Sequence, residues 1–182
     1  PASVLAFIEN HDTDRFLGEG NNLPMLKQAS TLLLTTRRIP QLYYGTEIMM
    51  NGVKSKSDGY VRKDFPGGLA DDKETALTAE GRSKIQNDCY NFYKTILNWR
   101  KGNDVIAKGS MVQFMVQNGV YAYARQYEGK TVFVMLNGTD AETTVPLKFY
   151  KEILKNSKQG KDILSGKAIT FGEELKMGPR ES

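Results

Sequence analysis

Apolar positions along the first hundred residues follow two periods, which together predict the order strand, helix, strand, helix. The run SVLAFIE at 3–9 is compact and apolar, as in a strand buried on both faces of a parallel sheet. Between 23 and 36, apolar side chains recur at steps of three and four residues with Pro24 in the first turn, which predicts a helix. A second buried strand is predicted at 39–44 and a second helix at 75–100.

A long polar segment at 50–73, rich in glycine, serine and aspartate, separates the second strand from the second helix. A structureless segment of this length inside a compact domain is usually functional. The element order is that of a parallel α/β protein. Two strands do not make a stable parallel sheet, so we expect the chain to be a piece of a longer one, with further strands before Pro1 and open sheet edges here.

Beyond residue 103 the pattern changes to short alternating strands that are separated by turn signals typical of hairpins. The turn signals are Asn118-Gly119, Glu128-Gly129 and Asn137-Gly138. The predicted strands lie at 111–116, 120–127, 131–136, 143–147 and 163–169. We therefore expect a domain boundary near residue 103, with an α/β part at 1–103 and an antiparallel β-sandwich at 104–182.

Composition narrows the protein class. Hydrophobic residues make up 40% of the 182, which suits a globular protein, and no apolar run approaches the roughly 18 residues of a membrane span. The net charge is +4, but basic residues such as Lys54 and Lys130 are dispersed, so nucleic-acid binding, which needs a concentrated stripe, is not expected. The single cysteine, Cys89, excludes an internal disulfide framework and is expected to be a buried thiol in the second helix.

The only histidine, His11, stands between Asn10 and Asp12, directly after the first predicted strand. Side chains at such a position leave the carboxyl edge of a parallel sheet, which is where catalytic residues gather in α/β barrels. From spacing alone, a capping cluster that closes the strand without binding a ligand explains these residues equally well.

The surrounding motifs resemble the alpha-amylase superfamily of glycoside hydrolases. FIENHD resembles the family's fourth signature region, which ends the seventh barrel strand, and IPQLYYGTEI resembles its eighth strand, with Arg38 where the family usually has glycine. GVYAYARQYEGKTVFVMLN is similar to a strand pair of the family's C-terminal domain, and DGYVRKDFPGG resembles loops of neopullulanases and cyclomaltodextrinases. The resemblance implies an α/β plus all-β fold, with strands seven and eight of a (β/α)8 TIM barrel followed by an antiparallel β-sandwich.

The same resemblance implies roles for individual residues. Asp12 matches the family's third essential carboxylate, which binds sugar hydroxyls and favours the oxocarbenium-like transition state. His11 is implied to donate a hydrogen bond to the same sugar, and Asn10 to orient the pair. In the long loop, Arg62 and Phe65 are candidates for substrate contacts, and a surface loop without sugar contacts is an equally open alternative.

Two further pairs of residues lie in or beside the same motifs. Asp14 and Arg15 are expected either to form a local ion pair at the rim of the cleft or to be solvated there. Tyr43 and Tyr44 are expected to pack behind the site rather than to touch substrate.

The family's retaining mechanism needs a nucleophilic aspartate, in a G-x-R-x-D pattern, and a glutamic acid about 5–5.5 Å away. Neither pattern occurs in the 182 residues. The resemblance therefore implies the C-terminal fragment of a retaining α-glucan hydrolase, acting on starch-derived maltodextrins, pullulan or cyclodextrins, and inactive by itself. The alternatives are a non-catalytic glucan-binding or interaction module on the same scaffold, and a transglycosylase or isomerase of the superfamily.

The implied partner is an α-glucan oligosaccharide or polysaccharide, without nucleic acid or a membrane span. Family members often bind calcium, but Asp71-Asp72 is too little for a calcium site, so no metal or other cofactor is assigned. Pairing with a second copy, as a homodimer, would cover the open sheet edges. The resemblance points to a bacterial protein of the periplasm or the cytoplasm.

Overall fold

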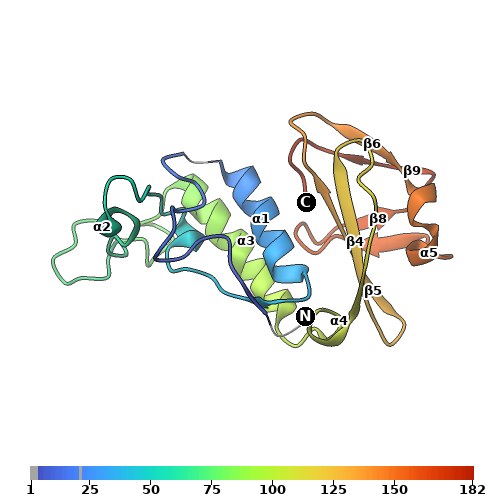
Figure 1. The fold of residues 1–182 in the computed structure, drawn as a ribbon, viewed down its shortest axis with the longest axis horizontal. Helices are drawn as coiled ribbons and strands as arrows, with labels where there is room; N and C mark the ends of the chain where they lie inside the picture. Colours follow the sequence, from blue (N-terminus) through green and yellow to red (C-terminus); the bar gives the residue numbers. More distant parts are fainter. Residues whose placement is uncertain (1–3, 21) are drawn as a thin grey trace. The chain divides into compact units, whose positions relative to one another are not determined.

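The computed structural model describes residues 4–20 and 22–182, which divide into two units. The N-terminal unit contains residues 4–33 and 38–94, and the C-terminal unit contains residues 34–37 and 95–182. Figure 1 traces the whole chain from blue to red. The domain boundary expected near residue 103 stays a prediction.

The first hundred residues contain short strands, two long helices and short helical turns. In chain order these are β1 (Leu5–Ala6), α1 (Leu23–Thr35), β2 (Ile39–Pro40), η1 (Thr46–Ile48), α2 (Asp58–Val61) and α3 (Lys84–Arg100). Strands β1 and β2 pair in parallel, with Leu5 opposite Ile39. The parallel direction of the two segments is as predicted, although both strands are shorter than the ranges 3–9 and 39–44.

Strands β1 and β2 carry exposed apolar side chains, so the predicted burial on both faces is wrong for this chain. The exposed fraction is 45% for Val4, 52% for Leu5 and 50% for Ile39. Within the described residues each of these strands has a single partner, because their sheet contains two strands. The exposure agrees with the open edges expected of a two-strand sheet.

Helix α1 agrees with the predicted range 23–36 to within one residue. Pro24 sits in its first turn, where the missing N–H has no intrahelical partner to lose. Of the apolar side chains whose spacing predicted the helix, Leu26 and Leu33 are 1% and 5% exposed, whereas Met25 and Leu32 are 41% and 37% exposed. Helices α1 and α3 lie side by side, and the hydroxyls of Ser30 and Tyr93 hydrogen-bond between them at 2.5 Å.

Helix α3 begins at Lys84, so the prediction of a helix from residue 75 is wrong at its start. Ser83 and Gln86 form a capping box: the Gln86 side chain accepts from the Ser83 N–H at 2.9 Å, and the Ser83 hydroxyl accepts from the Gln86 N–H at 3.4 Å. Before this cap the chain folds back on itself. Gly81 lies so close to Thr75 that an added Cβ would come within 2.0 Å of the Thr75 carbonyl oxygen.

The long polar segment is not structureless, because it contains α2. The Ser57 side chain accepts from the Tyr60 N–H at 3.1 Å and so caps the start of this helix. Gly52 packs against the same turn, where an added Cβ would lie 2.5 Å from the Tyr60 carbonyl oxygen. The loop therefore folds back so that α2 lies against Gly52 near the start of the loop. This fold brings the polar side chains of the loop toward the end of β1.

The last eighty residues form antiparallel sheets joined by short helical turns. In chain order the elements are α4 (Asp104–Lys108), β3 (Ser110–Gln113), β4 (Val120–Tyr127), β5 (Lys130–Asn137), β6 (Thr143–Pro146), η2 (Leu147–Tyr150), α5 (Lys151–Leu154), β7 (Gln159–Lys161), β8 (Ala168–Thr170) and β9 (Glu174–Met177). The sheets are β3-β4-β5, β6-β9 and β7-β8, and every pairing in them is antiparallel. The antiparallel, β-rich character of this part is confirmed.

The turns explain where strand prediction succeeded and where it failed. Glu128 and Gly129 have φ angles of 48° and 75°, which is the left-handed geometry that a two-residue hairpin requires between β4 and β5. The strand predicted at 163–169 is wrong, because a turn separates β7 from β8. The Asp162 carboxylate accepts from the Leu164 N–H at 2.9 Å and closes that turn.

Both faces of the β4–β5 hairpin are buried. On one face Val120 and Met135 pack with Val145 of β6 and Met177 of β9. The opposite face contains the cluster of Tyr123, Val134 and Leu136. The core of the C-terminal unit therefore lies between the three-stranded sheet and the β6-β9 pair, and its second face is covered as well.

Arg125 of β4 is fully buried and donates hydrogen bonds to several main-chain carbonyls. Its guanidinium donates hydrogen bonds to the carbonyl oxygens of Thr35, Ile106, Gly109 and Ser110, at 2.8 to 3.2 Å. Burial lowers the pKa of Arg125, but these carbonyls replace water around the cation. One side chain thus ties the last turn of α1 to α4 and β3.

Two fully buried tyrosines of the C-terminal unit give a matched test of this packing. The Tyr123 hydroxyl hydrogen-bonds the Thr35 hydroxyl at 2.5 Å, whereas the buried Tyr150 hydroxyl has no hydrogen-bond partner among the described residues. Tyr123→Phe should lower the free energy of unfolding by about 1–2 kcal/mol, and Tyr150→Phe should leave it unchanged or raise it by up to about 1 kcal/mol. Urea denaturation measures both, and a larger loss for Tyr150→Phe than for Tyr123→Phe would contradict the packing described.

The thiol of Cys89 gives a second test, because it is fully buried and lies 3.6 Å from the Thr46 carbonyl oxygen. Burial raises the pKa of Cys89 to about 12. The folded thiol therefore stays protonated where the unfolded one ionises, so its contribution to stability is complete below about pH 8.5 and falls as the pH rises. At pH 8 a disulfide reagent should react with the thiol of the folded protein only at the rate at which the protein opens. In guanidinium chloride, where the protein is unfolded, one equivalent of reagent should react per chain. Rapid labelling of the folded protein would show that the helix does not bury this side chain.

Candidate functional site

The chain turns sharply after β1 and presents two polar side chains to solvent. The Asn10 side-chain oxygen accepts from the Asp12 N–H at 2.7 Å, and the Asn10 N–H donates to the Thr13 hydroxyl at 3.1 Å. These bonds fix an Asx turn that positions the two residues between Asn10 and Thr13. His11 Nε2 lies 3.1 Å from Asp12 Oδ2, and both side chains are 60% exposed.

Arg62, at the end of α2, joins this turn from the long loop. Its Nε donates to the His11 carbonyl oxygen at 2.9 Å, and its NH2 lies 3.2 Å from Asp12 Oδ1. The same NH2 lies 3.1 Å from Asp58 Oδ2, one helical turn earlier on α2. The structure therefore brings Asn10, His11, Asp12 and Arg62 together, although fifty residues separate Asp12 from Arg62 in the sequence.

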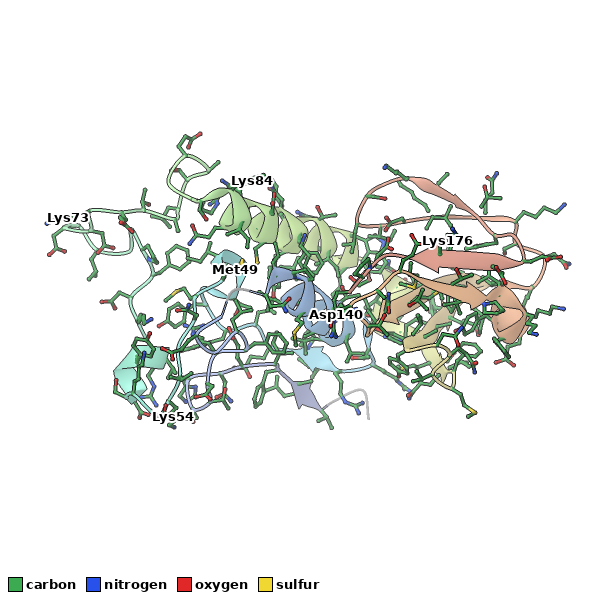
Figure 2. The ribbon with its side chains drawn as sticks, turned by 90° about the horizontal axis from the view of Figure 1, so that it is seen from above. Met49, Lys54, Lys73, Lys84, Asp140 and Lys176 are labelled. Carbon is green, nitrogen blue, oxygen red and sulfur yellow. The ribbon has the colours of Figure 1, made fainter. Side chains whose placement is uncertain are left out.

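Lys54 is a member of the cluster that the sequence prediction missed. Its ammonium group donates to the Asp12 carbonyl oxygen at 3.0 Å and lies 3.5 Å from Asp58 Oδ1. The spacing of four residues from Lys54 to Asp58 and again to Arg62 is the signal that could have revealed it. Figure 2 labels Lys54 beside the short helix α2.

Phe65 lies three residues beyond Arg62 and is half-buried. Its carbonyl oxygen accepts from the Gly68 N–H at 2.8 Å, which closes the following turn. The contacts that connect Asp12 to the loop come from Arg62 and Lys54. A substrate-binding role for Phe65 stays a prediction.

Below the exposed cluster, a buried ion pair holds the turn in place. The Arg15 side chain is 1% exposed, and its NH1 lies 3.2 Å from Glu9 Oε1. Glu9 also accepts from the Phe16 N–H at 2.5 Å and from the Thr46 hydroxyl. Neither alternative expected for Asp14 and Arg15 holds, because Arg15 is buried against Glu9 and Asp14 accepts from the Lys54 N–H.

Arg15 also connects the segments that carry the exposed residues. Its Nε donates to the Val61 carbonyl oxygen at 3.0 Å, and its NH1 donates to the Tyr44 carbonyl oxygen at 2.7 Å. The guanidinium carbon lies 4.0 Å from the centre of the Tyr43 ring and 4.9 Å from that of Tyr44. Both rings thus contact Arg15, but Tyr44 is 41% exposed, so the packing role expected for the two tyrosines stays a prediction.

The exposed cluster combines a carboxylate, an imidazole and two cations at one edge of the N-terminal unit. Such a set suits a neutral ligand rich in hydroxyls, because carboxylates accept hydrogen bonds while guanidinium and imidazole groups donate them. Among the described residues, no group of three or more His, Cys, Asp or Glu side chains could hold a metal ion. No helix in the described ranges is long and apolar enough to cross a membrane.

Comparison with known proteins shows that the chain is similar to alpha-amylases and cyclomaltodextrin glucanotransferases. Residues 111–182 match the family described as the cyclo-malto-dextrinase C-terminal domain. An alpha-amylase of Niallia circulans is 32% identical over 176 residues, which cover 92% of this chain and 29% of the relative. A cyclomaltodextrin glucanotransferase of Thermoanaerobacterium thermosulfurigenes is 32% identical over 184 residues, covering 97% of this chain and 22% of that enzyme. The chain thus spans less than a third of the length of these curated relatives.

Solved structures share the fold over nearly the whole chain. The alpha-amylase of Geobacillus thermoleovorans, complexed with acarbose, superposes with a TM-score of 0.74 at 24% identity, covering 98% of this chain and 37% of the other. The gamma-cyclodextrin glucanotransferase (gamma-CGTase) of alkalophilic Bacillus clarkii gives a TM-score of 0.69 at 25% identity, covering 97% of this chain and 25% of the other. These matches include the residues on both sides of position 103.

The buried ion pair under the cluster can be tested by substitution. Arg15→Met removes the cation but leaves the Glu9 carboxylate buried, so the free energy of unfolding should fall by about 3–5 kcal/mol. Arg62→Met removes a partly exposed cation and should cost at most about 1 kcal/mol. Guanidinium denaturation of both variants checks the difference, and equal losses would show that the Glu9–Arg15 pair does not hold the turn.

Proposed function

Since the chain belongs to the alpha-amylase superfamily, we propose that it is the C-terminal portion of a retaining α-glucan hydrolase of the neopullulanase, cyclomaltodextrinase or alpha-amylase type. Its substrates are starch-derived maltodextrins, pullulan or cyclodextrins. In this proposal β1 and β2 are the seventh and eighth strands of a (β/α)8 barrel, and residues 104–182 are the C-terminal β-sandwich domain.

The joint placement of Asn10, His11 and Asp12 at the end of β1 carries the proposal. Asp12 accepts hydrogen bonds from ring hydroxyls of the bound sugar and stabilises the positive charge that develops at the anomeric carbon in the transition state. His11 donates to the same sugar ring. Asn10 holds both residues in place through its bond to the Asp12 N–H.

Arg62 supports the same function from the loop. Its guanidinium contacts both Asp12 and Asp58, so its position is set before a ligand arrives. A preset donor loses less conformational entropy on binding than a mobile one. Phe65 supplies an apolar ring face for a sugar further along the glucan chain in this proposal.

The nucleophile and the acid of the retaining reaction come from residues outside this sequence, because neither motif is present in it. The 182-residue chain by itself therefore binds glucan but does not cleave it. A second candidate, a transglycosylase, is favoured by the 32% identity to a cyclomaltodextrin glucanotransferase. The two differ in whether water or a sugar hydroxyl attacks the glycosyl intermediate, and both use Asp12 in the same way.

The prediction for the isolated chain has two parts. Incubation with maltoheptaose should release no reducing ends, because the nucleophile and the acid are missing. Titration with maltotetraose should shift the amide resonances of residues 10–12, and Asp12→Asn should weaken that binding at least fivefold. The matched control is Asp88→Asn, which removes an exposed carboxylate on α3 that pairs only with Lys84 among the ion pairs of the described residues.

Either part can fail by itself. Reducing ends that appear with a clean preparation and vanish with Asp12→Ala would contradict the inactivity of the isolated chain. Equal binding by Asp12→Asn and Asp88→Asn would contradict the assignment of Asp12 to the sugar site.

A further inference from the structure

The excess positive charge of the chain is concentrated in one segment of the C-terminal unit, residues 148–167. The segment contains six lysines and two acidic residues, so it has the same net charge, +4, as the whole chain. The remaining residues therefore carry equal numbers of basic and acidic side chains. The lysines are Lys148, Lys151, Lys155, Lys158, Lys161 and Lys167. The dispersed pattern inferred from the other basic residues does not hold here.

These lysines are exposed and are not neutralised by the fold. All six belong to the exposed class, and in the part of the chain that the structure describes none of them forms an ion pair with a carboxylate. By contrast, Lys54, Lys56, Lys84, Lys108 and Lys176 each have an acidic partner. The proposed glucan substrate is neutral, so this charge has no use in binding it.

The first half of the segment is a short amphipathic helical stretch formed by η2 and α5. Lys148 and Lys151 lie three residues apart on this stretch, a spacing that places side chains on one face of a helical turn. Lys155 follows directly after α5, whereas Tyr150 and Ile153 are buried in the core. Phe149 is 43% exposed beside them, and the Lys148 ammonium lies 5.4 Å from the centre of its ring.

The second half is the β7–β8 hairpin, whose turn contains two apolar side chains. Ile163 and Leu164 are partly exposed at the turn and are flanked in sequence by Lys161 and Lys167. The one carboxylate at the tip, Asp162, is occupied in closing the turn, where it accepts from the Leu164 N–H. Both halves therefore combine lysines with apolar side chains that remain accessible to solvent.

We propose that residues 148–167 form a docking surface for an anionic lipid bilayer. Exposed lysines are attracted to the negative surface potential of such a membrane, and neighbouring apolar side chains enter the headgroup region. The segment has no arginine, the residue best suited to bidentate recognition of phosphates in nucleic acids and phosphoproteins. A surface of lysines with an exposed Phe149 fits diffuse attraction to a lipid surface better than recognition of one phosphate group.

The test is sedimentation of the 182-residue chain with extruded vesicles. Vesicles that contain 30% phosphatidylglycerol should bind the chain at low salt and release it as the salt rises, whereas pure phosphatidylcholine vesicles should not bind it. Each lysine near the surface contributes about a fivefold factor in partitioning, so the triple variant Lys148→Gln, Lys151→Gln, Lys155→Gln should bind about a hundredfold more weakly. Phe149→Ser should weaken the part of the binding that resists salt.

The matched control is the triple variant Lys73→Gln, Lys101→Gln, Lys130→Gln, which has the same net charge but changes exposed lysines outside the segment. It should retain at least a third of the binding, and its thermal unfolding should match that of the first variant. Failure to bind anionic vesicles, or equal losses in the two triple variants, would overturn the proposal. Tighter binding to duplex DNA than to the vesicles, lost with the same three lysines, would overturn it in favour of nucleic acid.

Discussion

The exposed site depends on the buried ion pair between Glu9 and Arg15. Neither charge has access to water, so each must be compensated by its partner and by hydrogen bonds. Arg15 meets most of this requirement with the main-chain carbonyls of Tyr44, beyond β2, and of Val61 in α2, although its Nη2 has no hydrogen-bond partner among the described residues. Glu9 is satisfied by the Phe16 N–H and the Thr46 hydroxyl. The result is that the end of β1, the end of β2 and the long loop are joined at one point.

In this arrangement the residues that hold the main chain in place differ from the residues that are exposed to a ligand. The buried pair fixes the main chain, while the exposed side chains of His11, Asp12 and Arg62 stay available to a ligand. Site precision of this kind needs neighbours that are locked by packing and hydrogen bonds, because loops by themselves hold side chains loosely. The rings of Tyr43 and Tyr44, which meet edge to face, provide that packing against the Arg15 guanidinium.

The C-terminal unit uses a second buried arginine, Arg125, in a different way. Its hydrogen-bond partners in the described structure are main-chain carbonyl oxygens of α1, α4 and the start of β3. It therefore holds these segments together without a buried carboxylate as its counterion. The charge that this unit shows to solvent lies elsewhere, on the lysines of residues 148–167. One chain can therefore carry the proposed sugar site on one unit and a basic surface on the other, because the two features use different side chains.

Local patterns in the sequence determined much of what the structure contains. The helix periodicity from residue 23, the Asn-Gly and Glu-Gly turns and the alternation of β4 depend on neighbours a few residues apart, so α1 and the β4–β5 hairpin could be predicted closely. The cluster of Asn10, His11 and Asp12 was visible for the same reason. The tertiary structure alone decided that Arg15 pairs with Glu9 rather than with Asp14, and that Lys54 and Arg62 reach Asp12 from a loop more than forty residues away. Those choices follow from burial and from long-range hydrogen bonding, which sequence spacing does not encode.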